Sequence, residues 1–141
     1  MLPNTFNKDC YLDHVAIAVN DLDGAQKKWE ALGLTFSSER EVVESQFVTT
    51  AFAPLDQHAH LELLCPYGDG GAIKKFLEKN GEGIHHLCFK VPDVKKKMEE
   101  LKAQGFRSVY EEATAGANNC LVNFIHPKST GGVLVEISQT L

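Results

Sequence analysis

The chain lacks the features that mark nucleic-acid-binding, membrane-spanning or secreted proteins. Its 141 residues carry 14 basic against 19 acidic side chains, so no basic stripe is expected for nucleic acid or anionic lipid. The longest apolar run, Val15–Val19, has five residues and is too short for a membrane span. The polar start Met1–Cys10 has neither an apolar leader core nor an Arg-rich transit pattern. We therefore expect a cytoplasmic protein that binds neither nucleic acid nor membrane.

Cysteine is scarce, and no two cysteines stand close together. The four are Cys10, Cys65, Cys88 and Cys120, with no CxxC pair among them. This spacing indicates neither a zinc ribbon nor a disulfide framework. A chain of this length can bury a sufficient core without such staples, so we expect one domain with reduced thiols.

An internal repeat organises the sequence. Residues 12–19 (LDHVAIAV) align with residues 84–91 (IHHLCFKV) at an offset of 72. Further matches at this offset are Asp21 with Asp93 and Gly33 with Gly105. Near the ends of the halves, residues 61–63 (LEL) align with residues 135–137 (VEI) at an offset of 74, as one or two loop insertions would produce. The repeat indicates two similar modules.

Each half is predicted to form a β-α-β-β-β unit. A strand that alternates around a histidine precedes an aspartate suited to a helix N-cap, and each helix ends at a glycine. The first cap is Asp21 or Asp23, and the second is Asp93. The extended segments that follow are predicted at 34–39, 46–53 and 60–65, and at 106–111, 119–125 and 132–138. Between the halves, residues 72–79 form a short amphipathic helix pattern.

Strand alternation places one histidine and one glutamate of each half on the sheet face away from the helices. The small neighbours of the first histidine, Ala16 and Ala18, are expected to leave room for a ligand. A pseudo-two-fold relation between the halves would bring together four side chains: His14, Glu62, His86 and Glu136.

Two imidazoles and two carboxylates suit a six-coordinate divalent ion (Co, Ni, Mn or Zn), with two positions left for substrate oxygens. Taken singly, a buried His or Glu is more often structural, but two facing carboxylates without a cation would be costly. His60 alternates on the face of Glu62 and is a rival ligand or pocket residue. Because His85 adjoins His86, one of the two is expected to have a structural or supporting role.

Four longer segments carry a resemblance to a known family: 12–25 (LDHVAIAVNDLDGA), 61–66 (LELLCP), 72–91 (AIKKFLEKNGEGIHHLCFKV) and 123–139 (NFIHPKSTGGVLVEISQ). They resemble the vicinal oxygen chelate superfamily, and within it the methylmalonyl-CoA epimerases. The resemblance implies an α+β fold in which two tandem βαβββ modules form a curved, half-open eight-stranded mixed sheet around a metal site. It implies a single domain, 1–141, with module one at 10–66, a linker helix at 67–81 and module two at 82–141. The implied metal ligands are His14, Glu62, His86 and Glu136.

The chain departs from these relatives at one stretch. Epimerases commonly carry an EQGV-like stretch at the entry to the third strand of the first half. Residues 44–47 here read ESQF, without the glycine. Some members place a catalytic Glu in the strand that follows, where this chain has Val48, Thr49 and Thr50. Glu44 is the nearest carboxylate.

The implied activity is that of a metal-dependent isomerase. It would interconvert the 2R and 2S forms of methylmalonyl-CoA by removing the α-proton through a metal-stabilised enolate. Return of the proton to the other face needs two acid/base groups, for which Glu136 is the first candidate and Glu44 the second. Lys128 and Ser129, in the turn before the last strand, are expected to contact the acyl-CoA substrate, and a homodimer is expected. The alternatives are a glyoxalase-type lactoylglutathione lyase and a non-enzymatic, antibiotic-sequestering protein.

Overall fold

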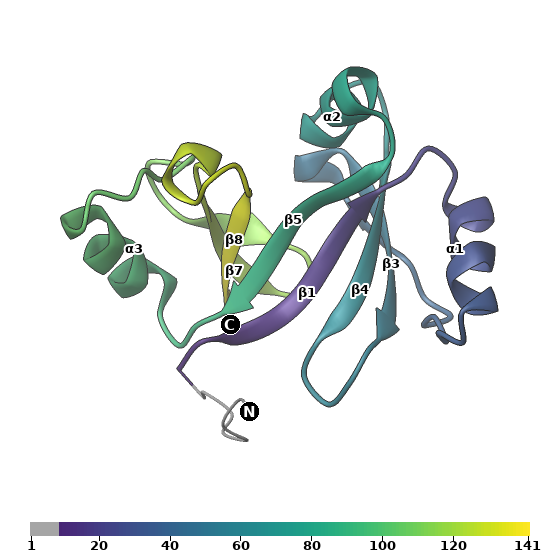
Figure 1. The fold of residues 1–141 in the computed structure, drawn as a ribbon, viewed down its shortest axis with the longest axis horizontal. Helices are drawn as coiled ribbons and strands as arrows, with labels where there is room; N and C mark the ends of the chain where they lie inside the picture. Colours follow the sequence, from purple (N-terminus) through teal and green to yellow (C-terminus); the bar gives the residue numbers. More distant parts are fainter. Residues whose placement is uncertain (1–8) are drawn as a thin grey trace. The chain divides into compact units, whose positions relative to one another are not determined.

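The computed structural model describes residues 9–141 (Figure 1). Its strands are β1 (Tyr11–Ala18), β2 (Glu41–Val43), β3 (Val48–Pro54), β4 (His60–Pro66), β5 (Gly83–Lys90), β6 (Thr114–Gly116), β7 (Cys120–Ile125) and β8 (Val135–Thr140). Its helices are α1 (Leu22–Ala31), α2 (Ala72–Asn80) and α3 (Val94–Ala103), with 3-10 turns η1 (Glu44–Gln46) and η2 (Pro127–Ser129). The strands form a mixed sheet in the order β2-β3-β4-β1-β5-β8-β7-β6. The predicted α+β fold with an eight-stranded sheet is confirmed.

Most of the polar start, for which no leader is expected, lies outside the described residues. None of the helices in residues 9–141 is long and apolar enough to cross a membrane. All four cysteines are free thiols.

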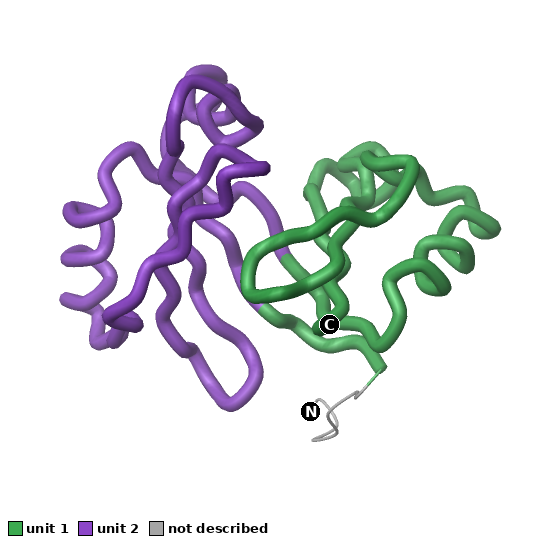
Figure 2. Tube along the Cα trace, turned by 180° about the vertical axis from the view of Figure 1, so that it is seen from behind, with its two compact units in different colours: residues 1–13, 88–141 green, residues 14–87 purple. Residues whose placement is uncertain are grey.

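The chain divides into two compact units, drawn in two colours in Figure 2. Unit 2 is His14–Leu87, and unit 1 consists of the residues up to Asp13 together with Cys88–Leu141. Strands β1 and β5 each contribute residues to both units.

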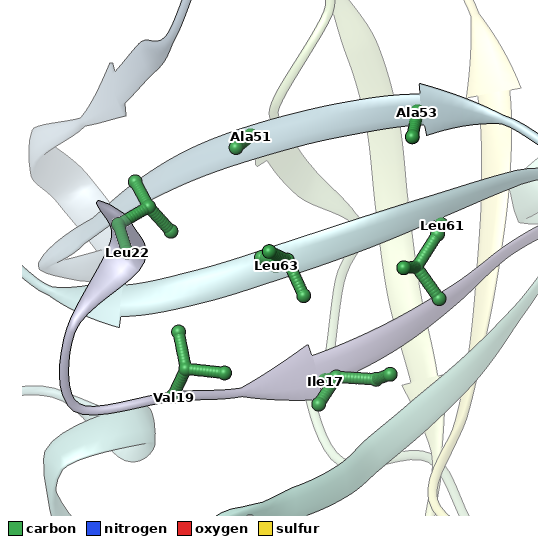
Figure 3. Packing of buried hydrophobic residues seen from close by; sticks show 7 residues of the cluster. All are labelled: Ile17, Val19, Leu22, Ala51, Ala53, Leu61 and Leu63. Atoms are coloured by element: carbon green, nitrogen blue, oxygen red, sulfur yellow. The ribbon is translucent and has the colours of Figure 1, made fainter. Parts of the chain in front are cut away.

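In unit 2, helix α1 packs on one face of the sheet. Strand β1 pairs in parallel with β4, which pairs in antiparallel fashion with β3. Side chains on this face, among them Ile17, Leu61 and Leu63, form a core with Leu22 of α1 (Figure 3). Trp29 of α1 packs at its edge. The prediction that Ile17 and Val19 pack towards the first helix is thus confirmed.

Helix α2 covers the opposite face of β1. Ala16 and Ala18 are fully buried in a cluster with Ile73, against which Phe76 and Leu77 pack. This packing confirms the predicted inward face of the short helix. Side chains of α2 therefore lie on this face of the sheet, in one cluster with the two alanines.

In unit 1, β7 lies between β8 and β6 and pairs with both in antiparallel fashion. Val94 and Met98 of α3 pack with Ile125 of β7 and Ile137 of β8, as the sequence pattern predicts. Because Ile137 faces α3, its neighbour Glu136 points to the other face of the strand.

The helix ends follow the predicted capping pattern. The Asp21 carboxylate accepts the Gly24 N–H at 3.3 Å, so the first of the two candidate aspartates caps α1. The Asp93 carboxylate accepts the Lys96 N–H at 3.0 Å and caps α3. The apolar spacing in the sequence also predicts that Leu32 lies on the inward face of α1 with Leu22. Leu32 is instead the C-cap of that helix and is 72% exposed, so this expectation is wrong.

The strand predicted at 34–39 is displaced to β2, at Glu41–Val43. Leu34 and Phe36 have the alternation of a strand, but they pack against the α1 core. A hydrogen bond from Ser37 N–H to Phe52 O, at 2.8 Å, ties this segment to β3. The alternating apolar residues of this segment therefore indicate that its side chains are buried. They do not indicate where the strand pairs with its neighbour.

The strand predicted at 106–111 is displaced to β6, at Thr114–Gly116, because a side chain interrupts the ladder. The Asn123 amide donates to Tyr110 O and accepts the Tyr110 N–H, both at 3.2 Å. Backbone pairing is reduced to an isolated bridge between Ser108 and Ile125. The other four predicted strands overlap β3, β4, β7 and β8.

Asn123→Ala is expected to lower the free energy of unfolding by about 1–3 kcal/mol, because removing a buried partner leaves polar groups of Tyr110 unsatisfied. Asn123 is 2% exposed, so water cannot readily replace its amide. Urea denaturation followed by circular dichroism measures the change. Thr114→Ala, at an exposed position of the adjacent strand β6, is the control, and equal stabilities of the two variants would contradict the assignment.

Candidate metal centre

Three of the four predicted ligands lie together in unit 2. His14 of β1, Glu62 of β4 and His86 of β5 are buried, with exposed fractions of 7%, 5% and 5%. His14 Nε2 lies 3.0 Å from Glu62 Oε2 and 3.2 Å from His86 Nε2. The register of β1 with β4 produces this meeting, since Glu62 pairs with Ala16, two residues along the strand from His14.

The spacing of these atoms fits a divalent cation. His14 Nε2 faces both a carboxylate oxygen and an imidazole nitrogen, yet a neutral imidazole carries a single N–H. A cation bound by N and O atoms at about 2.0–2.2 Å would hold neighbouring ligand atoms about 3 Å apart. The observed separations of 3.0 and 3.2 Å agree with such a shell. A mixed N/O donor set of this kind suits first-row divalent metals.

The fourth predicted ligand, Glu136, belongs to unit 1. It lies in β8 opposite Phe124 of β7 and is 9% exposed. A buried carboxylate on the strand face away from α3 is what the repeat predicts for the counterpart of Glu62.

His60 stands beside His14, as the alternation predicts. The two residues are partners in the β1–β4 register, and their ring centroids are 5.1 Å apart. Phe52 of β3 makes an edge contact with the His60 ring, also at 5.1 Å between centroids. The ligand atoms of His14, His60 and Glu62 lie within 4.8 Å of one another. His60 therefore lies beside the proposed ligands and has the chemistry of an additional one.

Glu44, the second predicted acid/base group, opens η1 and is exposed. It is not part of the clusters of metal-binding side chains within residues 9–141. Thr50, at one of the positions where relatives place a catalytic Glu, is fully buried, and its hydroxyl donates to Glu41 O at 3.2 Å. Thr50 thus joins β3 to β2.

Phe47, the last residue of the stretch that departs from the epimerases, has a backbone conformation that suits glycine. Its φ of 56° is left-handed, a conformation that costs a residue with a Cβ roughly 1–2 kcal/mol. Glycines in the turn after β4 accommodate the bulky ring, and a Cβ on Gly71 would lie 2.8 Å from Phe47 Cβ. The Phe47 side chain is therefore accommodated in a left-handed turn by the glycines that lie against it.

The two predicted substrate contacts lie in η2. Lys128 is exposed, whereas the Ser129 hydroxyl accepts the Arg107 N–H at 3.0 Å and braces the turn. His126 caps η2 by accepting the Lys128 N–H at Nδ1, at 3.1 Å.

No motif in the sequence marks Lys90, yet unit 1 holds its ammonium among polar partners. Its Nζ donates to Cys120 Sγ and Ser138 Oγ, both at 3.3 Å, and lies 3.8 Å from Asp13 Oδ1. Burial acts to lower the pKa of Lys90, but Asp13 and the bond to Cys120 raise it more, so the net pKa lies above its usual value. Lys90 is therefore charged at neutral pH.

A cavity of about 420 Å³ in unit 2 lies away from the histidine cluster. Ile17 and Val19 line it, together with Trp29 of α1 and Glu82. Ile17 of β1 and Val19, which follows the strand, both belong to the core on the α1 side. They point away from the face that carries His14, so this cavity is not the metal centre.

Comparisons with known proteins show the family of the chain. Residues 13–124 match the family described as the glyoxalase/bleomycin resistance protein/dioxygenase superfamily. The human mitochondrial methylmalonyl-CoA epimerase is 39% identical over 129 residues, which is 91% of this chain and 73% of the human one. The crystal structure of methylmalonyl-CoA epimerase from Mycobacterium tuberculosis superposes with a TM-score of 0.85 at 37% identity, covering 100% of this chain and 93% of that one. A methylmalonyl-CoA epimerase in complex with methylmalonyl-CoA and ammonium gives a TM-score of 0.82 at 34% identity, over 92% and 93% of the chains.

Proposed function

Because the chain belongs to the glyoxalase/bleomycin resistance protein/dioxygenase superfamily, we propose that it is a metal-dependent epimerase that interconverts the 2R and 2S forms of methylmalonyl-CoA. The observation that carries the proposal is the buried meeting of His14 with Glu62 and His86 in a chain similar to epimerases of this substrate along nearly its whole length. The reaction makes it an isomerase that acts on a CoA thioester.

We propose that His14, Glu62, His86 and Glu136 hold the ion. The first three meet within unit 2, and the repeat makes Glu136 the counterpart of Glu62. A divalent ion (Co, Ni, Mn or Zn) would supply Lewis-acid polarisation of the thioester and carboxylate oxygens, which favours the enolate. Burial of the ligand side chains strengthens this effect, because electrostatic interactions are less screened away from water.

The side chains then have to move one proton between the two faces of the α-carbon. Glu136 takes the α-proton as the C–H bond breaks, and the electron pair is delocalised into the thioester as an enolate. A second acid on the opposite face returns a proton to the carbon, which inverts its configuration. Glu44 is our candidate for this group, since Thr50 is engaged with the backbone of β2 and has no carboxylate.

The proposal also includes the contacts with the CoA moiety, the location of the protein and its oligomeric state. Lys128 is exposed on η2, where its charge can pair with phosphates of the CoA moiety, and Ser129 fixes the turn that presents it. A net charge of −5 does not attract an anionic substrate, so local positive charge has to do so. We place the protein in the cytoplasm as a homodimer, with residues 1–141 acting as one domain made of the two modules.

Racemisation tests the proposal. The purified protein with a divalent ion is incubated with methylmalonyl-CoA of one configuration, and the circular dichroism of the substrate is followed over time. Enzyme-dependent decay to the racemic signal supports the proposal. An unchanged signal together with consumption of the methylglyoxal–glutathione hemithioacetal would assign the chain to the lactoylglutathione lyases.

The proposed ligand set predicts how many imidazoles bind the metal. In the Co²⁺-loaded protein, the exchangeable N–H protons of coordinated histidines give paramagnetically shifted ¹H NMR signals. Two such signals are expected, from His14 and His86, and each should vanish in the corresponding alanine variant. Three signals, one of them lost in His60→Ala, would contradict the proposed set and make His60 a ligand. His58→Ala, which removes an exposed histidine two residues away, is the control.

A further inference from the structure

The His85 ring, adjacent to a proposed ligand, contacts that ligand's second ring nitrogen. His85 Nδ1 lies 2.8 Å from His86 Nδ1, and the two rings meet edge to face, with centroids 5.1 Å apart. His86 Nε2 is turned to His14. The two nitrogens of one imidazole therefore have separate partners, one at the proposed metal centre and one outside it.

This geometry fixes which ring carries which proton. A neutral imidazole that offers Nε2 to a cation keeps its proton on Nδ1, so His86 Nδ1–H is the donor of the 2.8 Å hydrogen bond. His85 Nδ1 must then be the acceptor, and the proton of His85 lies on Nε2. Such a bond to the outer nitrogen orients a metal-binding histidine and raises its basicity.

Helix α2 holds the accepting ring in place. The Phe76 and His85 rings meet at 86° with centroids 5.0 Å apart, and Phe76 packs against the core beneath α2. A continuous set of packed rings thus runs from α2 through His85 to His86. Aromatic edge-to-face pairs of this kind restrict ring rotation and add to the stability of the arrangement.

We propose that His85 is a positioning residue that fixes the tautomer and ring orientation of His86, and that Phe76 anchors it from α2. The inference rests on the proposed function, because it requires a cation at the His14–Glu62–His86 cluster. It also assigns a role to His85, the member of the His85-His86 pair that is not a proposed ligand. Strand alternation alone left that role open.

The first test needs no variant. Two-bond ¹H–¹⁵N correlation spectra of the Zn²⁺-loaded protein report the tautomer of each histidine ring. The expected result is the Nδ1–H tautomer for His86 and the Nε2–H tautomer for His85. An Nδ1–H tautomer of His85 would overturn the inference, because that ring could then not accept the bond from His86.

The second test measures metal affinity by Co²⁺ titration of chelator-treated protein. His85→Phe keeps an aromatic ring against Phe76 but removes the acceptor, and it is expected to weaken Co²⁺ binding about 10- to 100-fold. His85→Gln, which retains an acceptor oxygen, should recover part of the affinity. His58→Phe is the matched control on an exposed histidine and should bind Co²⁺ as the unmodified protein does.

The outcomes separate this inference from the proposed function. Equal Co²⁺ affinity in His85→Phe and the unmodified protein would overturn the positioning role and leave the epimerase proposal in place. Failure of the unmodified protein to bind any divalent ion would overturn both.

Discussion

Glu136→Gln is expected to slow the exchange of the methylmalonyl-CoA α-proton with solvent deuterium by about 10²–10⁴-fold, the usual contribution of a positioned base. The reason is chemical, since an amide of the same shape can contact a metal through its oxygen but cannot accept the proton. Exchange is followed by ¹H NMR in D₂O at saturating substrate. The bound metal is measured on the same sample, so that loss of the ion and loss of the base are distinguished.

Glu112→Gln serves as the control for Glu136→Gln. It removes an exposed carboxylate of the same unit and should leave exchange unchanged. Near-full exchange by a metal-loaded Glu136→Gln protein would show that another group removes the proton. Glu44→Gln would then be the next variant to measure.

His14→Ala is expected to weaken metal binding by more than about 100-fold, exceeding the usual effect of changing an outer partner, and to abolish epimerisation. His14 Nε2 takes part in both short separations of the cluster, to Glu62 and to His86, so its removal leaves these two side chains without their common neighbour. Competition with a fluorescent chelator measures the affinity.

Two comparisons make the His14→Ala result specific. Glu62→Gln retains an oxygen ligand, so it should keep measurable metal binding and activity. His58→Ala removes an exposed imidazole and should bind metal normally. Metal affinity of His14→Ala equal to that of the unmodified protein would remove His14 from the ligand set.

The repeat in the sequence accounts for most of what could be predicted. Strand alternation predicts that His14 and Ile17 are buried on opposite faces of β1. The equivalent pattern in the second half identifies His86 as the counterpart of His14. The caps at Asp21 and Asp93 depend on local hydrogen bonds, which are readable from neighbouring residues.

The failed predictions depend on contacts between distant residues. The two edge strands lie at other residues than predicted. Leu34 packs against the α1 core, and the Asn123 amide makes the hydrogen bonds of the Tyr110 backbone. Ala16 is buried in one cluster with Ile73 of α2, a helix that begins more than fifty residues later in the chain. Alternation shows that a side chain is buried, but it does not show which group buries it.

The contacts around His85 and Lys90 have the same origin. The sequence shows two adjacent histidines, but the 2.8 Å approach of their Nδ1 atoms depends on how Phe76 packs against His85. The sequence does not show that Lys90 has polar partners. Its ammonium contacts Asp13, Cys120 and Ser138 only once the chain has folded.

Solvent deuterium exchange into methylmalonyl-CoA tests most directly whether the protein is a metal-dependent epimerase. The exchange is measured with the unmodified protein, first stripped of metal and then reloaded with a divalent ion. We expect rapid exchange with the ion, a fall to the buffer rate on stripping, and recovery on reloading. Exchange at the buffer rate in the metal-loaded protein, while the methylglyoxal–glutathione hemithioacetal is consumed, would contradict it.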